Sequence, residues 1–371
     1  MQPLRSRFSK RPESIKNERI ERLPRSFEIF RRGFQYGKRR KSWADEDDER
    51  RMMRQQWCIT LVLAFVIGGS ADAADKVRIS VSSLDVAFFT PAVAHKRGFF
   101  KEEGLEAELI RMNANISVTA LATGDIDYTM IFGSVVRAAT RGLPVKVVAS
   151  FLDSPTQMLI ARPEYKSVKE LKGKILGVST FGATADVSAR MMLRYSGIDP
   201  EKEMKILALG AERARFSALK EGIVDVVVIS PPADSEGSAL GFRVLARAYD
   251  LFKFPFVGLG VNVKKINERP DEVKRVIKAL IKANRFIRTN REGSIQVLTE
   301  WGRTTRENAS ASYDSTVKVF NQDGSIPDDG LRLVLEQAKE GAKLSRDVSA
   351  GDVADLTILR QAQRELAAPP K

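Results

Sequence analysis

The sequence predicts an α/β protein of two lobes, each built on a mostly parallel β-sheet that is flanked by helices. Three observations support this prediction. Short apolar strands alternate with helical segments between residues 77 and 229, a pattern that is typical of parallel sheets covered on both faces. The alternation occurs twice in succession. Both halves also share one phrase, in which a helix ends at a glycine and an Asp-containing apolar strand follows: LATGDID at 121–127 and LKEGIVD at 219–225.

Alternation of apolar and polar residues and the positions of glycines predict the individual elements. In the first half, we expect strands at 77–83, 105–111, 127–131 and 145–151, and helices at 88–97, 116–122 and 134–140. In the second half, we expect strands at 175–178, 204–208 and 224–229, and helices at 184–195 and 212–220. After a strand at 256–263 the chain is expected to be helical, at 270–289, 292–302, 305–319, 327–343 and 352–366.

The charge distribution argues against a nucleic-acid-binding protein. The 371 residues have a formal net charge of +14, but residues 1–74 carry 17 Lys and Arg against 10 Asp and Glu, which is half of this excess. The remainder is mildly basic and has no dense stripe of Lys and Arg, which nucleic-acid binding would require.

Residues of the usual catalytic and metal-binding types are scarce. Cys58 and His95 are the only cysteine and the only histidine, which excludes a disulfide framework, a Cys/His zinc site and a Cys–His nucleophile pair. His95 falls within the predicted helix 88–97, where we expect a partly exposed surface residue. We therefore predict that the protein is not an enzyme and uses no metal and no cofactor.

The segment 52–74 has the features of a secretory signal peptide. Arg50, Arg51 and Arg54 precede an apolar run at 57–67, and Ala71-Asp72-Ala73 follows as a cleavage site. The alternative is a membrane anchor, but the run is well short of the roughly 20 residues that span a bilayer. Cys58 lies at the start of the run, so we do not expect a lipoprotein. We expect export to the periplasm as a soluble chain.

Residues 1–51 precede this signal and show no apolar periodicity. They are rich in Arg, Lys, Glu and Ser. Met52 and Met53 stand where a signal peptide would begin, so residues 1–51 are interpreted as a non-native upstream extension. The alternative is a disordered cytoplasmic arm.

Four stretches carry a resemblance to a known family. They are PAVAHKRGFF at 91–100 with EGL at 103–105, LATGDID at 121–127, RGLPV at 141–145, and SVKELKGK at 167–174 with GV at 177–178. In this order and spacing, they resemble the nitrate/sulfonate/taurine and thiamine-precursor (pyrimidine) family of ABC-transporter solute-binding proteins. The similarity covers roughly residues 76–345.

The resemblance implies the bilobal type II periplasmic-binding-protein fold, with a hinge of two crossing strands. Lobe 1 would comprise 76–165 plus 256–371, and lobe 2 would comprise 166–255. The implied function is the extracytoplasmic capture of a small, anionic or zwitterionic solute, such as a sulfonate or nitrate. The implied partners are that solute and a membrane permease with its cytoplasmic ATPase. We expect a monomer and no nucleic-acid partner.

The ligand site is expected in the cleft between the lobes, where the resemblance and the general behaviour of open α/β sheets both place it, at the carboxyl ends of the strands. Helix N-termini with free N–H groups favour an anionic ligand group, although Thr180 or Thr184 could also be ordinary N-caps. The predicted ligand-binding residues follow the strands of both halves: Ser83, Asp85, Phe88, Phe89, Ser134, Thr156, Thr180, Phe181, Ala183, Thr184 and Ser230.

Several alternatives stay open at the level of sequence. Phe88 or Phe89 could be a core residue instead of a wall of the cleft. No arginine can be assigned to the site, and Arg137, Arg213 and Arg215 are equally good candidates. Asp225 is interpreted as structural. A binding protein that feeds a sensor is an alternative function. An enzyme of the pyrimidine-synthase type is disfavoured, since that branch of the family relies on a cysteine-rich motif and an active-site histidine.

Overall fold

The computed structural model describes residues 74–342 and 348–368, which all lie in one of the two units into which the chain divides, Asp72–Lys371. The predicted signal peptide at 52–74 and the extension at 1–51 fall, except for Ala74, outside these residues. Among the described residues, none of the helices combines the length and apolarity that crossing a membrane would require.

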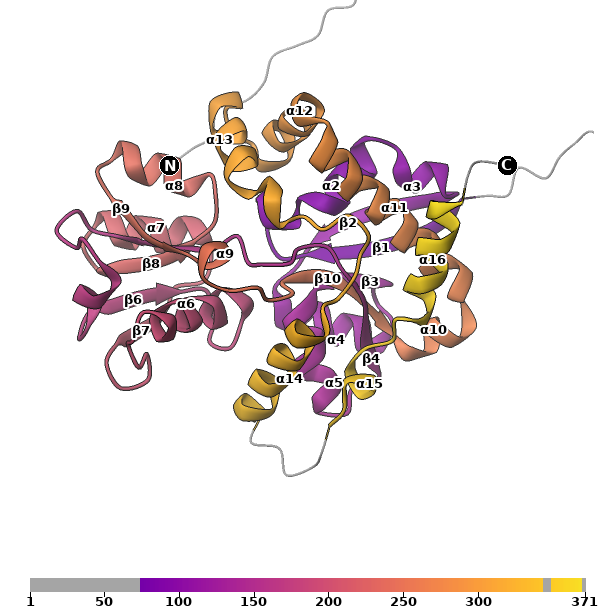
Figure 1. Cartoon of the computed structure of the whole chain (residues 1–371), viewed down its shortest axis with the longest axis horizontal. Coiled ribbons are helices and arrows are strands. Elements are labelled where there is room, and N and C mark those ends of the chain that lie inside the picture. Colours follow the sequence, from indigo (N-terminus) through magenta and orange to yellow (C-terminus); the bar gives the residue numbers. More distant parts are fainter. Residues whose placement is uncertain (1–73, 343–347, 369–371) are drawn as a thin grey trace, which may run out of the picture. The chain divides into compact units, whose positions relative to one another are not determined.

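The described part of the chain forms two separate five-stranded sheets (Figure 1). The first sheet has the order β2-β1-β3-β10-β4. Its strands are β1 (Asp75–Val81), β2 (Leu105–Arg111), β3 (Tyr128–Ile131), β4 (Val145–Ser150) and β10 (Val257–Asn262). β1 pairs in parallel with β2 and β3, whereas β10 runs antiparallel to β3 and β4.

The second sheet repeats this arrangement in the order β7-β6-β8-β5-β9. Its strands are β5 (Met158–Ala161), β6 (Ile175–Val178), β7 (Lys205–Ala208), β8 (Val226–Ile229) and β9 (Arg243–Arg247). β6 is parallel to β7 and β8, and β5 runs antiparallel to β8 and β9. In each sheet, therefore, four strands share one direction and one strand opposes them, which confirms the predicted fold class.

The antiparallel strand of each sheet enters from the other half of the chain. After β4 the chain crosses to β5 in the second sheet, and after the short helix α9 (Ala248–Leu251) it returns to β10 in the first sheet. Two crossing segments thus connect the halves, as the family resemblance implies. The second sheet begins at Met158, however, whereas the sequence-based division keeps residues up to 165 in lobe 1. The boundary moves because β5 pairs with β8 and β9.

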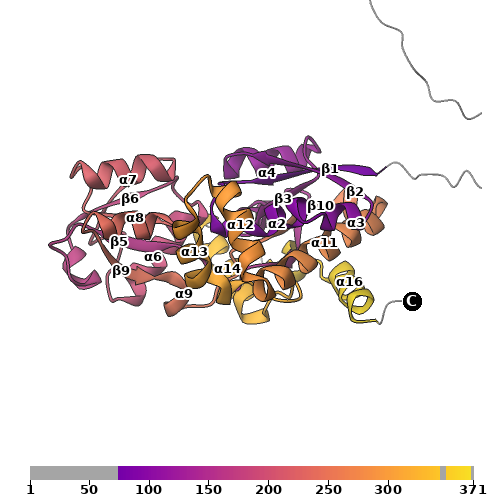
Figure 2. The same ribbon diagram turned by 90° about the horizontal axis from the view of Figure 1, so that it is seen from above.

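Helices cover both faces of each sheet (Figures 1 and 2). One face of the first sheet buries its core against α2 (Phe89–Lys96), α11 (Pro270–Thr289), α12 (Arg291–Gly302), α13 (Arg306–Thr316) and α16 (Thr357–Ala367). The other face packs against α4 (Ala114–Thr123), α5 (Phe132–Thr140), α14 (Asp328–Ala342) and α15 (Ala350–Val353). In the second sheet, α6 (Thr184–Tyr195) covers one face, and α7 (Glu212–Lys220) with α8 (Ala233–Ala239) covers the other.

The sequence of β8 explains why its sheet is buried on both sides. All four residues of β8 (VVVI) are buried. Val226 and Val228 pack toward α6, and Val227 and Ile229 toward α7. Successive side chains of a strand point to opposite faces, so a continuous apolar run is what a doubly covered strand needs.

The phrase shared by the two halves has the same structural role in both sheets. Gly124 and Gly222 have positive φ angles of 85° and 73°, a conformation that favours glycine and ends the preceding helix. Asp127 then accepts a 2.8 Å hydrogen bond from the backbone N–H of Arg78 in β1. Asp225 accepts one of 2.9 Å from the N–H of Ile175 in β6. Each aspartate therefore ties the central strand of its sheet to the strand beside it.

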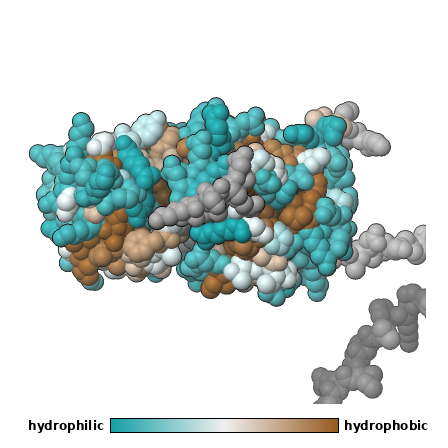
Figure 3. All heavy atoms as spheres, turned by 90° about the horizontal axis from the view of Figure 1, so that it is seen from below, coloured by the Kyte–Doolittle hydropathy of each residue, from teal (hydrophilic) through white to brown (hydrophobic). Residues whose placement is uncertain are grey.

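Surface apolar side chains are scattered. Figure 3 shows hydrophilic residues over much of the face seen from below, interrupted by separate apolar areas. The exposed large apolar residues of the described chain come from many elements: Ile116, Leu143, Phe181, Tyr195, Leu207, Ile223 and Leu240. Single exposed apolar residues of this kind are usual on soluble domains.

Candidate functional site

The loop after β1 holds Asp85 in a defined geometry. Its carboxylate accepts one hydrogen bond from the Ser83 hydroxyl (2.7 Å) and one from the backbone N–H of Ala87 (2.9 Å). The Trp301 indole N–H donates to the Asp85 backbone carbonyl at 3.1 Å. Ser83 and Asp85 are both half-buried. The fold thus fixes this carboxylate at the carboxyl end of a central strand.

The facing part of the second sheet contributes Glu212 and Arg215 from the first turn of α7. Glu212 accepts a hydrogen bond from the backbone N–H of Ser230, which follows β8. Arg215 is buried and donates to the carbonyls of Val228 (2.8 Å) and Gly210 (2.6 Å). Its other terminal nitrogen lies 3.8 Å from Glu212 Oε1. Arg215 therefore joins the end of β8 to the start of α7.

Electrostatic interactions link the two halves at this point. The pKa of Glu212 is raised from its ordinary value to about 7. Burial makes the largest contribution to this rise, and the negative charge of Asp85 makes the second largest. Burial lowers the pKa of the Arg215 guanidinium, and the charges of Glu212 and Asp85 act in the opposite direction. Burial also raises the pKa of Asp85. Asp85 of the first half therefore interacts electrostatically with the Glu212–Arg215 pair of the second half.

Gln157 and Asp234 complete this group. Gln157 lies in the first crossing segment, is 6% exposed, and donates from its side-chain amide to Ser230 Oγ at 3.3 Å. Asp234 lies in the first turn of α8, and its charge contributes to the raised pKa of Glu212. We refer to the six residues that meet here as the acceptor cluster: Asp85, Gln157, Glu212, Arg215, Ser230 and Asp234.

A second contact between the halves involves the helices α5 and α6. Ser134 is buried in the first turn of α5 and accepts a 2.7 Å hydrogen bond from Arg137. Burial lowers the pKa of Arg137 to about 10, and the charge of Asp186 in α6 counteracts this effect. Asp186 in turn accepts from the Gly182 N–H at 2.7 Å and from Arg190 at 2.8 Å. Arg137 of the first half and Asp186 of the second therefore interact electrostatically.

The predicted loop before α6 has the exposure that a binding loop requires. Thr180, Ala183 and Thr184 are half-buried, and Phe181 is 58% exposed. Ala183 is the N-cap residue, and among the described residues no side chain caps the helix there. Neither Thr180 nor Thr184 is therefore the N-cap, and the first N–H groups of α6 face the surface of this loop.

The other predicted residues are buried. Phe88 and Phe89 both belong to the core of the first sheet, and Phe89 has no exposed surface and packs edge-to-face on Phe320 at 6.4 Å. The structure thus assigns Phe89 to the core. Thr156 is fully buried in the first crossing segment, and its hydroxyl has no hydrogen-bond partner among the described residues. His95 is exposed on α2.

The structure therefore joins several predicted residues and adds others that the sequence did not reveal. Ser83 contacts Asp85, Ser230 contacts Glu212, and the charges of Asp85 and Glu212 act on each other. Ser134 contacts Arg137, on which the charge of Asp186 in α6 acts. Glu212, Gln157 and Asp234 were not predicted. Glu212 could have been found by the rule that selected Thr180, since it begins the helix after a predicted strand. Gln157 had no comparable signal, because β5 itself was not predicted.

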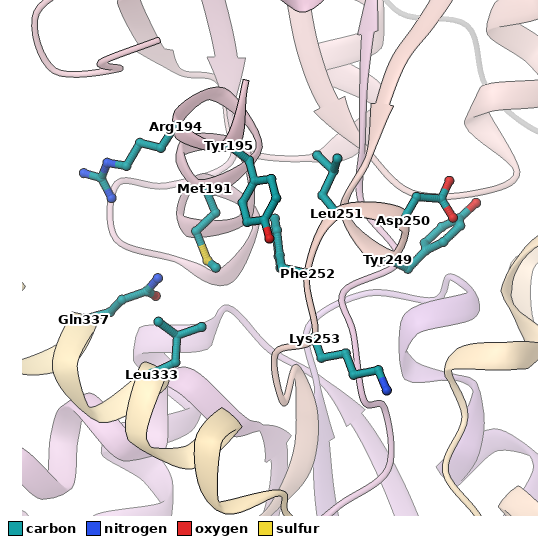
Figure 4. Close-up of a pocket in the computed structure, with 10 residues that line it drawn as sticks. All are labelled: Met191, Arg194, Tyr195, Tyr249, Asp250, Leu251, Phe252, Lys253, Leu333 and Gln337. Atoms are coloured by element: carbon teal, nitrogen blue, oxygen red, sulfur yellow. The ribbon is translucent and has the colours of Figure 1, made fainter. Parts of the chain in front are cut away.

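A cavity of about 690 Å³ lies on another side of the crossing segments (Figure 4). Its lining comes from α6, from α9 with the segment after it, and from α14: Met191, Arg194, Tyr195, Tyr249, Asp250, Leu251, Phe252, Lys253, Leu333 and Gln337. Tyr195 packs against Phe252, with ring centroids 6.0 Å apart. We call this cavity the hinge pocket. None of the predicted ligand-binding residues lines it, and it combines elements of both halves with the second crossing segment.

No group of three or more His, Cys, Asp or Glu side chains within the described ranges forms a metal site.

Residues 87–293 match the family model described as NMT1/THI5 like. A protein of Brucella abortus (strain 2308), named as a binding protein, is 25% identical over 290 residues, which cover 74% of this chain and 89% of that protein.

Two solved structures show the same fold. The alkanesulfonate-binding protein SsuA from Xanthomonas axonopodis pv. citri bound to MOPS is 19% identical with a TM-score of 0.60, and the match covers 79% of this chain and 99% of that one. The periplasmic nitrate-binding protein NrtA from Synechocystis PCC 6803 is 15% identical with a TM-score of 0.65, covering 80% and 90%. These likenesses confirm the predicted bilobal binding-protein fold.

Proposed function

Because the chain belongs to the NMT1/THI5-like family, we propose that it is the solute-binding component of an ABC importer. In this proposal it acts in the periplasm, captures a small solute between its two halves, and delivers it to a membrane permease with a cytoplasmic ATPase. The similar proteins named for sulfonate and nitrate binding support a small solute as ligand. Residues 76–157 with 256–371 would form one lobe and residues 158–255 the other, because β5 belongs to the second sheet.

One observation supports the proposal: the acceptor cluster combines a carboxylate that follows a strand of the first sheet with side chains that follow strands of the second, and their charges act on each other. Asp85 follows β1 of the first sheet, and Ser230 follows β8 of the second. Open α/β sheets bind ligands at the carboxyl ends of their strands. A ligand held between two such ends would contact both halves at once. It would therefore favour the conformation in which the halves are closest.

The two crossing segments provide the hinge for this motion. They run from β4 to β5 and from α9 to β10. The hinge pocket lies beside the second of them and has walls from both halves. A rotation of one half against the other would change the size of this pocket. In this proposal the pocket therefore provides space for the hinge motion, while the solute binds at the acceptor cluster.

Thermal unfolding in the presence of small solutes tests the proposal. The panel contains nitrate, ethanesulfonate, taurine, small carboxylates and pyrimidines. A solute that binds the folded state alone raises the melting temperature in a saturable way, and at least one class is expected to do so. The proposal fails if no solute in the panel or in a metabolite extract raises the melting temperature, and if mass spectrometry of the purified protein finds no bound small molecule.

A pull-down with the solute-bound protein then distinguishes between two possible partner proteins. Binding to the permease supports the importer, whereas binding to a sensor protein supports the alternative of a binding protein that feeds a sensor.

A further inference from the structure

The acceptor cluster has more hydrogen-bond acceptors than donors. Asp85 accepts from Ser83 and Ala87, and Glu212 accepts from the Ser230 N–H. A carboxyl group has about four lone-pair sites when ionised and retains acceptor capacity when protonated, so both groups can accept further hydrogen bonds. Asp234 adds a buried carboxylate oxygen, Oδ1, that has no hydrogen-bond partner among the described residues.

Gln157 gives an independent indication of a missing partner. The residue is 6% exposed, and its amide contacts Ser230 through Nε2, while Oε1 has no partner in the described part of the chain. Whichever end of the amide faces Ser230, the other end remains open. Buried polar side chains are nearly always hydrogen-bonded, so an open buried amide beside Ser230 indicates a bound molecule.

The arginines nearby do not supply the missing donors to Asp85 and Glu212. Arg215 is committed to the carbonyls of Val228 and Gly210. Arg247, at the end of β9, interacts electrostatically with Asp234 instead. Its positive charge lowers the pKa of Asp234, although burial raises that pKa by more. An oxyanion bound beside Glu212 and the open Asp234 oxygen would add negative charge to a group of carboxyls, whereas an N–H group with positive charge would be attracted by them and would favour the ionised form of Glu212.

We propose that the solute carries a nitrogen group that donates hydrogen bonds, such as an ammonium, an amidine or an amino-substituted heterocycle, and that Asp85, Glu212 and Gln157 receive it. This inference rests on the proposed function, and it narrows the expected ligand from an anionic or zwitterionic solute to one that bears an N–H donor, which excludes simple oxyanions.

The test uses the full-length chain and pairs of solutes that differ chiefly in the donor. Isothermal titration compares taurine with ethanesulfonate, and 4-aminopyrimidine with pyrimidine, with nitrate as the simple oxyanion. The donor-bearing member of at least one pair is expected to bind at least tenfold more tightly.

Substitution Glu212→Gln keeps an oxygen for the Ser230 N–H and removes the charge, and it is expected to weaken binding of the donor-bearing solute tenfold or more. Glu221→Gln, an exposed residue after α7, is the matched control and should leave binding unchanged.

The outcomes separate this inference from the proposed function. Binding of nitrate or ethanesulfonate that equals that of the donor-bearing solutes, and that Glu212→Gln does not weaken, would overturn the inference while leaving solute capture intact. If no probe binds, mass spectrometry of the co-purified ligand decides: a molecule without an N–H donor overturns the inference. The absence of any bound or stabilising small molecule overturns the inference and the proposed function together.

Discussion

At the scale of single residues, Glu212 should make the protein less stable as the pH rises. Its pKa is raised to about 7 by burial and by Asp85, with a further contribution from Asp234 and an opposing one from Arg215. Between its ordinary pKa near 4.5 and about 7, the folded state keeps a proton that the unfolded state has released. The free energy of unfolding therefore falls across this window, by up to about 3 kcal/mol for this one group.

Glu212→Gln removes this titration. We expect the variant to lose less stability than the parent between pH 4.5 and pH 7, as measured by urea unfolding at several pH values. Asp85 has a raised pKa as well, so part of the slope should remain. Equal slopes for the parent, Glu212→Gln and the control Glu221→Gln would contradict the assignment.

Two arginines of α7 allow a matched comparison at the same scale. Arg215 is 6% exposed and holds two backbone carbonyls, whereas Arg213 is exposed. Arg215→Met should reduce the free energy of unfolding by about 3 kcal/mol, because it leaves two buried carbonyls without their donor and removes the positive charge 3.8 Å from Glu212. Arg213→Met should change it by less than about 0.5 kcal/mol. Denaturant unfolding checks both values, and similar losses for the two variants would refute the distinction.

These arginines also show where the sequence stops being informative about the site. Arg213 and Arg215 are two positions apart on one predicted helix, and nothing in the pattern states which side faces the sheet. The burial of Arg215 depends on the carbonyls at the ends of β8 and of the loop before α7. Only the packed structure brings those carbonyls within its reach. Ser83, Asp85 and Ser230 were predictable because each directly follows a predicted strand.

At the scale of elements, the phrase shared by the two halves is visible in the sequence, and the structure shows what its aspartates do. Asp127 and Asp225 hold equivalent strands in the two sheets. The strands β5 and β9 were missed. β5 is a four-residue apolar run too short to show a period, and β9 begins and ends with arginine. Their pairing is antiparallel and is set by the crossing of the chain between the sheets, which no local pattern encodes.

The equivalence of the two aspartates leads to a prediction about their combined loss. Asp225→Ala leaves the Ile175 N–H and the Tyr165 hydroxyl without their acceptor, and should cost about 1–3 kcal/mol of unfolding free energy. Asp127→Ala should cost at least as much, because Asp127 also pairs with Lys265 at 2.8 Å. The two losses should add in the double variant, since the residues serve separate sheets and share no partner.

The exposed Asp125, from the same phrase, supplies the control. Asp125→Ala should be nearly neutral in the same urea titrations. A double variant of Asp127 and Asp225 whose loss differs clearly from the sum would show that the two sheets are energetically coupled through these residues.

At the scale of the whole molecule, the sequence predicted two lobes and two crossings but could not predict which side chains meet between them. Asp85 and Glu212 belong to different sheets, and their proximity follows from how the halves pack. The same packing places Trp301 beside the site, since its indole N–H donates to the backbone carbonyl of Asp85 at 3.1 Å. Trp301 is half-buried, so its environment should respond when the halves close around a solute.

Trp301 can therefore report closure of the two halves. In a full-length variant with Trp43→Phe and Trp57→Phe, Trp301 is the only tryptophan. Addition of a solute that raises the melting temperature should shift the emission of Trp301 to shorter wavelength, because closure excludes water from its surroundings. The radius of gyration from small-angle X-ray scattering should fall over the same range of solute concentration. Saturable binding with neither change would mean that the solute binds without moving the halves, and the hinge role of the crossing segments would then be wrong.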